Sequence, residues 1–362
     1  MTLPTLSTET VLEALRGVQE PDLHRDIVSL HMVHDLAVRE GRVWMTLRLN
    51  TPASSHRAVL EQDVRAKLAN VPGLQAVELR FDTQVPTARA GAVGQGIPGV
   101  KNIIAVGSGK GGVGKTTVAV NLAIALRDMG ATVGLLDSDV YGPNVPRMMG
   151  IQQMPRVLGE NRIEPLENYG VRLMSMGFIN PGDKPTIWRG PMLHSAVQQF
   201  LRQVEWGKLD YLIIDLPPGT GDVVLSLAQS VPLTGAVVVT TPSEVSLEDA
   251  RKALAMFVQL KVDVLGLVEN MSTFVCPHCH ESVDIFSHGG GETIAALFNV
   301  PFLGALPLQP EVRRGGDCGR PVAVEGAEAP RARPYFDLAR QVAAQVGLRA
   351  ESGEADFLKI RA

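Results

Sequence analysis

The 362-residue sequence predicts an α/β protein in which a mostly parallel, doubly wound sheet follows a small N-terminal α+β domain. Two observations predict the sheet. From Lys101 onward, short continuous apolar runs alternate with helical patterns, which is typical of parallel strands covered by helices on both faces. A glycine-rich loop follows the first of these runs and leads directly into a helix. Such sheets bind ligands at the carboxyl ends of their strands, so we expect the functional site there.

The N-terminal domain is expected over residues 1–82, with the order helix, strand, strand, helix, strand. The first helix is predicted over residues 10–18, where apolar residues have helical spacing. A hairpin follows, with strands at 36–38 and 43–49. In the second of these strands apolar and polar residues alternate, as they do in a half-buried strand. A helix over 53–69 and a strand around 77–81 complete the domain.

A change in composition separates this domain from the sheet. Residues 83–99 are rich in Gly, Ala and Pro without periodicity, which predicts a flexible linker. The sheet domain is expected over 100–350, followed by a polar tail at 351–362. Its six predicted strands cover residues 103–106, 132–136, 211–214, 236–240, 264–268 and 302–306.

The composition excludes several classes of protein. A hydrophobic fraction of 45% is too high for a disordered chain, and a net charge of −4 gives no support to a broadly basic nucleic-acid binder. The apolar runs are of strand length, too short to cross a bilayer. Three cysteines cannot build a disulfide scaffold. We therefore expect a reduced, cytoplasmic protein that binds neither nucleic acid nor membrane.

The glycine-rich loop contains the pattern GxxxxGK[ST] from Gly109 to Thr116, between a strand and a helix. In this P-loop pattern the glycines let backbone N–H groups surround phosphates, Lys115 reaches the β- and γ-phosphates, and the hydroxyl of Thr116 ligates Mg²⁺. The motif predicts a nucleotide bound with Mg²⁺. The residues expected to bind it are Gly107, Ser108, Gly109, Lys110, Gly111, Gly112, Val113, Gly114, Lys115, Thr116 and Thr117.

Acidic side chains end two other predicted strands. Asp137 and Asp139 follow one of them, and Asp215 follows another at the position of a Walker B carboxylate that holds the Mg²⁺ shell. An aspartate at a strand end also serves as a helix N-cap, which is the structural alternative for Asp139. The Pro-Pro-Gly segment after Asp215 is suited to present the N–H of Gly219 to a γ-phosphate, as switch loops do.

Cys276 and Cys279 form a CxxC pair, a spacing that places two sulfurs on one metal ion. They supply half of a four-cysteine set, and Cys318 stands alone, so a complete set requires two chains. The residues leave open an iron–sulfur cluster shared between subunits and a zinc ion completed by the partner chain or by His278 and His280. A redox dithiol is disfavoured, because such motifs begin a helix.

The loop form KGGVGK, with its additional Lys110, resembles the deviant P-loop of the MinD/ParA/nitrogenase-iron-protein class of dimeric ATPases. The resemblance implies that ATP is the nucleotide and that Lys110 reaches the partner's phosphates, as an arginine finger does. It further implies that Asp139 positions the attacking water, with Asp137 near the metal, and that Asn270 contacts adenine. From the residues alone, a turn-forming role for Asn270 stays open. Lys110, Lys115 and Asp139 are then the catalytic residues.

Four segments together resemble the Mrp-type (ApbC-like) iron–sulfur cluster carrier ATPases over residues 101–348: KGGVGKTT, LLDSDVYGPNVPRMMG, PPGTGD and VENMS…CPHC. That family implies a homodimer in which Cys276 and Cys279 of both chains transiently hold a bridging [4Fe–4S] cluster. The cluster comes from an iron–sulfur scaffold and passes to apoprotein clients, with ATP binding and slow hydrolysis gating the exchange.

The N-terminal domain resembles the MIP18-like domain of bacterial members through Glu20-Pro-Asp22, Asp26-Ile-Val-Ser-Leu30 and Thr51-Pro-Ala53. Such domains usually carry a cysteine where this chain has Ser54 and Ser55. Hydroxyls are poor iron ligands, so we expect a docking role for this domain rather than a metal site.

The alternative hypothesis is a MinD/ParA-like positioning ATPase with a structural zinc at the CxxC pair. A membrane-bound version would end in a basic amphipathic helix, whereas the predicted helix at 334–346 is followed by Glu351, Glu354 and Asp356. Neither a membrane role nor a DNA role explains the cysteine pair. The cluster carrier is therefore the leading hypothesis.

Overall fold

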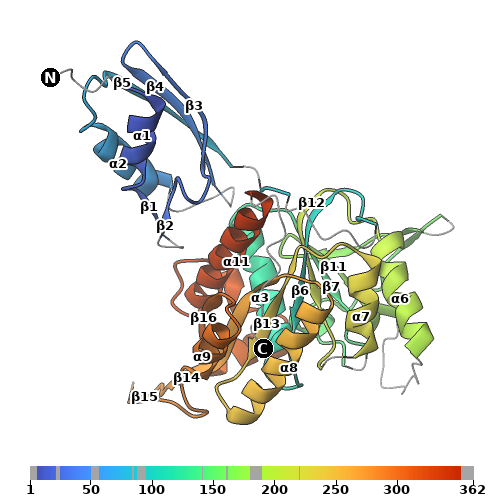
Figure 1. Ribbon diagram of the computed structural model, residues 1–362. Helices are drawn as coiled ribbons and strands as arrows, with labels where there is room; N and C mark the ends of the chain where they lie inside the picture. Colours follow the sequence, from blue (N-terminus) through green and yellow to red (C-terminus); the bar gives the residue numbers. More distant parts are fainter. Residues whose placement is uncertain are drawn as a thin grey trace.

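The chain folds around two separate hydrophobic cores, one in the N-terminal domain and one in the sheet domain. The computed structural model describes residues 6–21, 25–49, 57–83, 85–87, 95–140, 142–159, 162–179, 190–219, 221–279 and 281–351. The two units are distinct in Figure 1, where the N-terminal elements are blue. Leu348, near the end of the last helix, packs against the N-terminal core.

A three-stranded sheet and two helices form the N-terminal unit. Strand β4 (Arg42–Arg48) is central and pairs antiparallel with β3 (Val33–Arg39) and parallel with β5 (Ala76–Asp82). Helices α1 (Thr8–Leu15) and α2 (Arg57–Leu68) contact each other and pack on this sheet. The alternation predicted for β4 is observed, because its apolar residues are buried and their neighbours are not. The short strands β1 (Gln19–Glu20) and β2 (Arg25–Asp26) were not predicted.

Helix α1 begins earlier and ends earlier than the predicted 10–18. Ser7 and Thr10 form a capping box: Ser7 Oγ accepts from the Thr10 N–H at 3.2 Å, and Thr10 Oγ1 accepts from the Ser7 N–H at 2.8 Å. The capping box therefore fixes the helix start at Thr8. Gly17 follows the helix end, and Val18 is buried from the loop beyond it.

The sheet domain is built on nine strands in the order β10-β11-β7-β12-β6-β13-β14, with β16 paired to β14 and β15 antiparallel to the end of β14. All six predicted strands are present. Seven neighbouring strands of the sheet run parallel, namely β11, β7, β12, β6, β13, β14 and β16. The strands are β6 (Val100–Gly107), β7 (Val133–Asp137), β10 (Leu166–Asn168), β11 (Val171–Ser175), β12 (Leu209–Asp215), β13 (Gly235–Thr240), β14 (Val264–Val275), β15 (Ser282–Val283) and β16 (Phe302–Leu308). A separate pair, β8 (Val157–Leu158) and β9 (Arg162–Ile163), lies outside this sheet.

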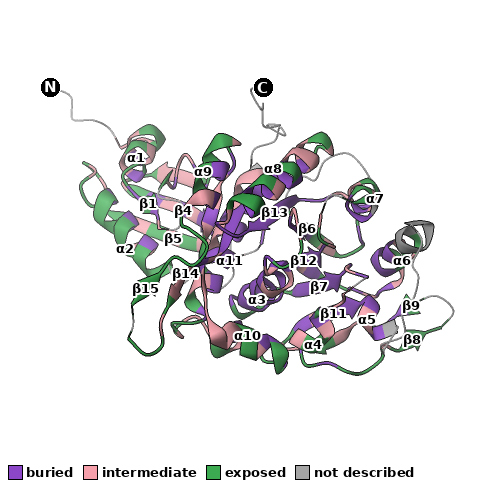
Figure 2. Ribbon diagram, turned by 90° about the horizontal axis from the view of Figure 1, so that it is seen from below, coloured by how far each residue is buried: buried purple, intermediate pink, exposed green. Residues whose placement is uncertain are grey.

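Helices cover both faces of the sheet. The connection from β6 through α3 (Lys115–Asp128) to β7 runs toward the β10 edge, and that from β13 through α8 (Glu244–Gln259) to β14 runs toward the β16 edge. Because such crossovers are right-handed, the two helices lie on opposite faces (Figure 2). The other helices are α4 (Val145–Met148), α5 (Met176–Ile179), α6 (Gly190–Gln203), α7 (Asp222–Ser230), α9 (Gly290–Leu297), α10 (Pro310–Asp317), the 3₁₀ helix η1 (Val322–Glu325) and α11 (Arg333–Glu351).

Strand β14 is longer than predicted and determines where the cysteine pair lies. The prediction ended the strand at residue 268, but β14 continues to Val275 and pairs there with β15. The polar residues that ended the apolar run are buried by specific partners; the Glu269 carboxylate, for example, accepts from the Gly291 N–H at 2.6 Å. The CxxC pair is therefore at the tip of a β-hairpin that extends from the sheet.

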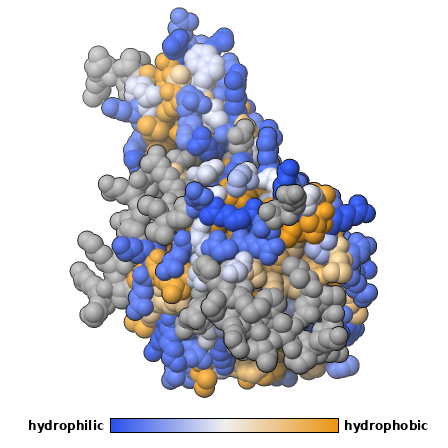
Figure 3. Space-filling view, turned by 90° about the vertical axis from the view of Figure 1, so that its right-hand side faces the viewer, coloured by the Kyte–Doolittle hydropathy of each residue, from blue (hydrophilic) through white to orange (hydrophobic). Residues whose placement is uncertain are grey.

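Among the described residues, no helix is both long and apolar enough to cross a bilayer. Where the atoms in Figure 3 are coloured, its hydrophobic patches are small and are interrupted by hydrophilic side chains.

Asp210, at the start of β12, joins three strands. Its carboxylate accepts from Lys101 Nζ on β6 at 2.8 Å and from both the N–H (2.9 Å) and the hydroxyl (2.8 Å) of Thr132, just before β7. Burial acts to raise the pKa of Asp210, but these hydrogen bonds outweigh it and leave the pKa below its ordinary value.

We therefore expect Asp210→Asn to lower the free energy of unfolding by about 1 kcal/mol at neutral pH. Since the pKa is lower in the folded state, this stabilisation is present above the unfolded-state pKa of about 4 and disappears as the pH falls through the folded-state value. Denaturant unfolding of both proteins between neutral and acidic pH measures the difference. A difference that grows toward low pH would contradict this sign.

Candidate functional site

The P-loop connects β6 to α3 at the carboxyl edge of the sheet. Gly112 and Gly114 have φ values of 82° and 84°, a left-handed conformation that glycine adopts without the steric penalty of a side chain. Gly114 is the N-cap of α3, so the loop leads directly into the helix N-terminus. Such an end, with its free N–H groups and positive dipole, favours phosphate. The local structure is the one that the motif predicts.

Gly109 is fixed by a close approach to α8. A Cβ atom built on Gly109 would lie 2.0 Å from the carbonyl oxygen of Asp249, a backbone atom that no side-chain rotation can move away. We expect Gly109→Ala to displace the loop and to weaken nucleotide binding by about tenfold or more, in the range that overpacking produces. Isothermal titration with ADP measures this loss.

Gly221→Ala is the matched control for that measurement, because a Cβ on Gly221 meets no atom within 4 Å. Parental ADP affinity in Gly109→Ala would mean that the loop moves away from α8 at little cost.

Lys115, Thr116 and Asp215 form a buried polar cluster behind the loop. Lys115 Nζ lies 2.6 Å from Asp215 Oδ1, and Thr116 Oγ1 donates to Asp215 Oδ2 at 2.7 Å. Asp215 is fully buried and Lys115 is 7% exposed. Burial raises the pKa of Asp215, while the Lys115 ammonium acts in the opposite direction. The carboxylate and hydroxyl oxygens are ligands that suit Mg²⁺, and they converge from different elements as predicted.

Asp137 lies beneath the site and does not line its cavity. Its carboxyl group accepts from Ser175 Oγ at 2.9 Å and from the Asp139 N–H at 3.1 Å. Burial, with the charge of Asp215, raises the pKa of Asp137 to about 8. In this arrangement Asp137 holds the segment that carries Asp139.

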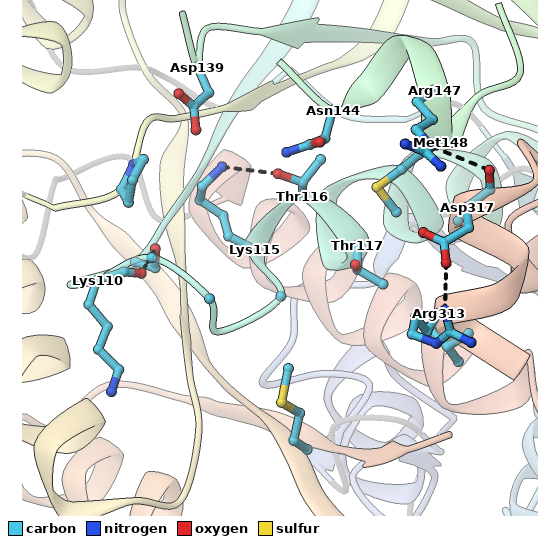
Figure 4. Close-up of a pocket in the computed structure, with 18 residues that line it drawn as sticks. Lys110, Lys115, Thr116, Thr117, Asp139, Asn144, Arg147, Met148, Arg313 and Asp317 are labelled. Carbon is cyan, nitrogen blue, oxygen red and sulfur yellow. Dashed lines mark hydrogen bonds and ion pairs between the residues drawn. The ribbon is translucent and has the colours of Figure 1, made fainter. Parts of the chain in front are cut away.

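The cavity in front of the P-loop has a volume of about 400 Å³. Nine of the residues predicted from the sequence line it: Ser108, Lys110, Gly111, Gly112, Gly114, Lys115, Thr116, Thr117 and Asp139. In Figure 4 the side chains of Asp139 and Lys115 are both seen at the cavity, whereas the ammonium of Lys110 points away from both Lys115 and Thr116.

The far wall of the cavity comes from residues that were not among the predicted site residues. Helix α4 contributes Arg147 and Met148, and α10 contributes Arg313 and Asp317, which are joined by an ion pair of 2.7 Å. The α10 residues lie almost two hundred positions from the P-loop, and α4 has only four residues. Arg147 and Met148 lie within the segment LLDSDVYGPNVPRMMG, which is a local signal for them, whereas Arg313 and Asp317 reach the cavity only in the folded chain.

Gly219 and Asn270 contact the P-loop itself. The Gly219 N–H donates to the Ser108 carbonyl at 3.0 Å, and Asn270 Nδ2 donates to the Val113 carbonyl at 2.8 Å. Neither residue lines the cavity, but their neighbours Pro218 and Met271 do. The structure therefore brings both predicted residues to the site and gives each of them a loop-holding contact.

Cys276 and Cys279 lie together at the tip of the β14–β15 hairpin. Hydrogen bonds from the Cys279 and His278 backbone N–H groups and from the Cys279 thiol lower the pKa of Cys276, which favours the thiolate that binds metal. Within the described residues, which omit His280, no cluster of three His, Cys, Asp or Glu side chains is arranged to hold a metal ion. Cys318 is exposed at the end of α10, in another part of the fold. Ser54 and Ser55 lie outside the described residues.

Two family models match the chain. The NUBPL iron-transfer P-loop NTPase model matches residues 99–343, and an iron–sulfur cluster assembly protein model matches residues 8–80. The iron–sulfur cluster carrier protein of Synechocystis sp. is 48% identical over 353 residues, covering 95% of this chain and 99% of that protein. The carrier protein of Escherichia coli is 39% identical over 350 residues, covering 96% and 95%. The iron–sulfur cluster transfer protein NUBPL of Dictyostelium discoideum is 48% identical over 252 residues, covering 69% and 78%.

Solved structures confirm the predicted fold class. A nucleotide-binding protein from Archaeoglobus fulgidus in complex with ADP superimposes with a TM-score of 0.56 and 37% identity, over 64% of this chain and 91% of that one. The cell division ATPase MinD of Pyrococcus furiosus gives a TM-score of 0.50 and 25% identity, over 67% and 98%. The resemblance predicted from the motifs is therefore confirmed. The chain belongs to the family of iron–sulfur cluster carrier proteins, which combines a MinD-like P-loop NTPase with an N-terminal iron–sulfur cluster assembly domain.

Proposed function

We propose that two copies of this chain hold one [4Fe–4S] cluster between them and carry it from a scaffold protein to apoproteins, with ATP binding and slow hydrolysis gating the exchange. The cluster is cargo. The observation that carries the proposal is the paired cysteines at an exposed hairpin tip, with no further ligand converging on them in the described part of the chain. Because a [4Fe–4S] cluster takes four cysteine ligands, a second copy supplies the missing two.

The surroundings of the cysteines support burial against a second chain. Four apolar side chains on and after the hairpin are 39–50% exposed: Val275, Val283, Ile285 and Phe286. Exposed apolar side chains grouped in this way are typical of interaction sites. A partner that covers them would also keep water from a cluster held at the tip.

The nucleotide site supports ATP hydrolysis. Thr116 and Asp215 would hold Mg²⁺, which supplies positive charge at the phosphates when bound. Lys115 is within reach of the β- and γ-phosphates from its position beside Asp215. We propose that Asp139 orients the attacking water from the cavity wall and that Lys110 of the opposite chain completes the site. Asn270 has its amide nitrogen on Val113, so its amide oxygen is the atom proposed to contact adenine.

The chain is proposed to divide into the N-terminal domain (1–82), linker (83–99), ATPase domain (100–350) and tail (351–362) expected from the sequence. The N-terminal domain would dock a scaffold or client protein rather than bind metal. Similar domains usually carry a cysteine where this chain has Ser54 and Ser55, and hydroxyls are poor iron ligands. We propose a cytoplasmic homodimer with no nucleic-acid or membrane partner.

Anaerobic reconstitution with iron and sulfide tests the carrier proposal. We expect about one [4Fe–4S] cluster per two chains, seen as thiolate-to-iron absorption together with iron and sulfide content. The Cys276→Ala/Cys279→Ala variant should bind almost no cluster, and the Cys318→Ser control should match the parent. Equal cluster content in the double variant and the parent would overturn the proposal. Stable zinc binding in place of a cluster would favour the structural-zinc alternative.

A further inference from the structure

Strand β14 belongs to both functional sites. At one end of its last segment, Asn270 donates to the P-loop carbonyl of Val113, and Met271 lines the nucleotide cavity. Five residues further along, the same strand leads into Cys276. Neither family membership nor the proposed function says what this short connection does.

A bulge interrupts β14 between the two sites. The ladder with β16 pairs Asn270 with Leu306 and next pairs Phe274 with Leu308, so three residues of β14 lie opposite the single residue Pro307. Proline has no N–H to donate, and a regular ladder cannot continue past it. The extra residues of β14 bend out of the ladder, and Ser272 Oγ restores one contact by donating to the Leu306 carbonyl at 3.2 Å.

Met271 begins this bulge in an uncommon backbone conformation. Its φ of 56° is in the left-handed region, which side chains other than Asn, Asp and Gly rarely adopt. Its Cε atom lies 3.6 Å from the position that a Cβ on Gly114 would occupy, so the side chain lies against the last residue of the P-loop. Met271 also forms part of the wall of the nucleotide cavity.

Beyond the bulge, regular pairing leads to the cysteines. Phe274 pairs with Val283, Val275 pairs with Ser282, and the Cys276 N–H donates to the Glu281 carbonyl at 3.0 Å. A paired segment of this kind moves as a unit, whereas a strained, unpaired residue changes its dihedral angles more readily. Along β14, the hairpin is therefore joined to the nucleotide cavity through the bulge that Met271 begins.

We propose that Met271 is a positioning residue through which a nucleotide in the cavity alters the setting of Cys276 and Cys279. This inference rests on the proposed function, because it concerns the gating of the cluster by the nucleotide. Contact between the nucleotide and the Met271 side chain changes the bulge, and the hairpin carries that change to the thiols. By linkage, a cluster held by the cysteines alters nucleotide affinity to the same extent.

The test measures thiol reactivity in cluster-free, full-length protein. In a Cys318→Ser background, the alkylation rates of Cys276 and Cys279 by iodoacetamide are followed by peptide mass mapping, without nucleotide and with saturating Mg-ADP. We expect Mg-ADP to change the rates by about fivefold, a typical coupling between two sites. In Met271→Gly, which retains left-handed backbone but loses the side chain, the rates with and without Mg-ADP should agree within measurement error.

Met154→Ala is the control, because Met154 is an exposed methionine that neither lines the cavity nor belongs to β14. With Mg-ADP again saturating, it should keep the fivefold change. Met271→Asn, which also tolerates left-handed backbone, repeats the test if the glycine variant is unstable. A nucleotide effect that survives in the Met271 variants, or an absence of any effect in the parent, would overturn the proposal.

Failure of this inference is distinguishable from failure of the proposed function. Reconstitution of the Met271→Gly variant should give parental cluster content, since its cysteines are intact. A protein that binds the cluster but shows no nucleotide effect on its thiols would retain the carrier proposal and lose this one.

Discussion

Replacing Asp215 with asparagine is expected to lower ATP turnover by about a thousandfold, the size of effect seen when a charged group at a phosphoryl-transfer site is lost. Asparagine has nearly the same shape but lacks the charge that Mg²⁺ requires. It also lacks the charge that offsets the buried Lys115 ammonium 2.6 Å away. Steady-state phosphate release with excess Mg-ATP measures the loss.

The same substitution has a second, separable consequence. Removing one partner of a buried ion pair leaves an uncompensated charge, which costs about 3 kcal/mol or more. The nucleotide-free variant should therefore unfold at lower denaturant concentration than the parent. Phosphate groups offer Lys115 a new counter-charge, so ADP without Mg²⁺ should stabilise the variant more than it stabilises the parent.

Asp210→Asn is the control, because Asp210 lies at the opposite end of the same strand. It should retain turnover near the parental value. If Asp215→Asn retains parental turnover, Asp215 is not needed for hydrolysis, and if its nucleotide-free form is as stable as the parent, the ion pair with Lys115 does not stabilise the fold.

The parts of the fold that the sequence predicted are those whose signals are local. Strands β6, β12 and β13 each contain a continuous apolar run and end in Gly, Asp and Thr, and the P-loop motif contains its own turn chemistry in Gly112 and Gly114. Strand β11 was not predicted, because its five residues form no continuous apolar run. It is held as a strand by pairing with β7, which lies almost forty residues earlier in the sequence.

The length of β14 could not be predicted because its polar residues are satisfied only in the folded chain. Glu269 caps the start of α9, Asn270 holds Val113, and Ser272 contacts Leu306. In the sequence these residues resemble the end of a strand. The bulge at Met271 likewise depends on Pro307 in a different strand.

The roles of single side chains in the site were only partly predictable for the same reason. A motif predicts that Asn270 and Gly219 lie at the nucleotide edge, but it does not predict which group each of them contacts. In the structure both donate to P-loop carbonyls. Asp137 shows the complementary case, because its burial and its partner Ser175 remove it from the cavity wall that its neighbour Asp139 occupies.

The second large effect is expected for Lys110→Ala, which should lower ATP turnover by about a thousandfold, as loss of an arginine finger does. Nucleotide affinity should change little, because the Lys110 ammonium points away from Lys115 and Thr116 within its own chain (Figure 4). Turnover and ADP titration together separate these two effects. Lys208→Ala, which removes an exposed lysine that does not line the cavity, is the control and should retain parental turnover.

Mixing two inactive variants decides from which chain Lys110 acts. If it acts on the partner's nucleotide, a heterodimer of Lys110→Ala and Asp139→Ala has one intact site, formed by the P-loop and Asp139 of the first chain and Lys110 of the second. An equal mixture should then recover about a quarter of the parental turnover, because half of randomly formed dimers are heterodimers and one of their two sites is complete. If Lys110 acts within its own chain, every site in the mixture lacks one of the two residues and no turnover returns. Recovery therefore requires the same two-chain assembly that the paired cysteines require. An inactive mixture would mean that the nucleotide site does not need a second chain.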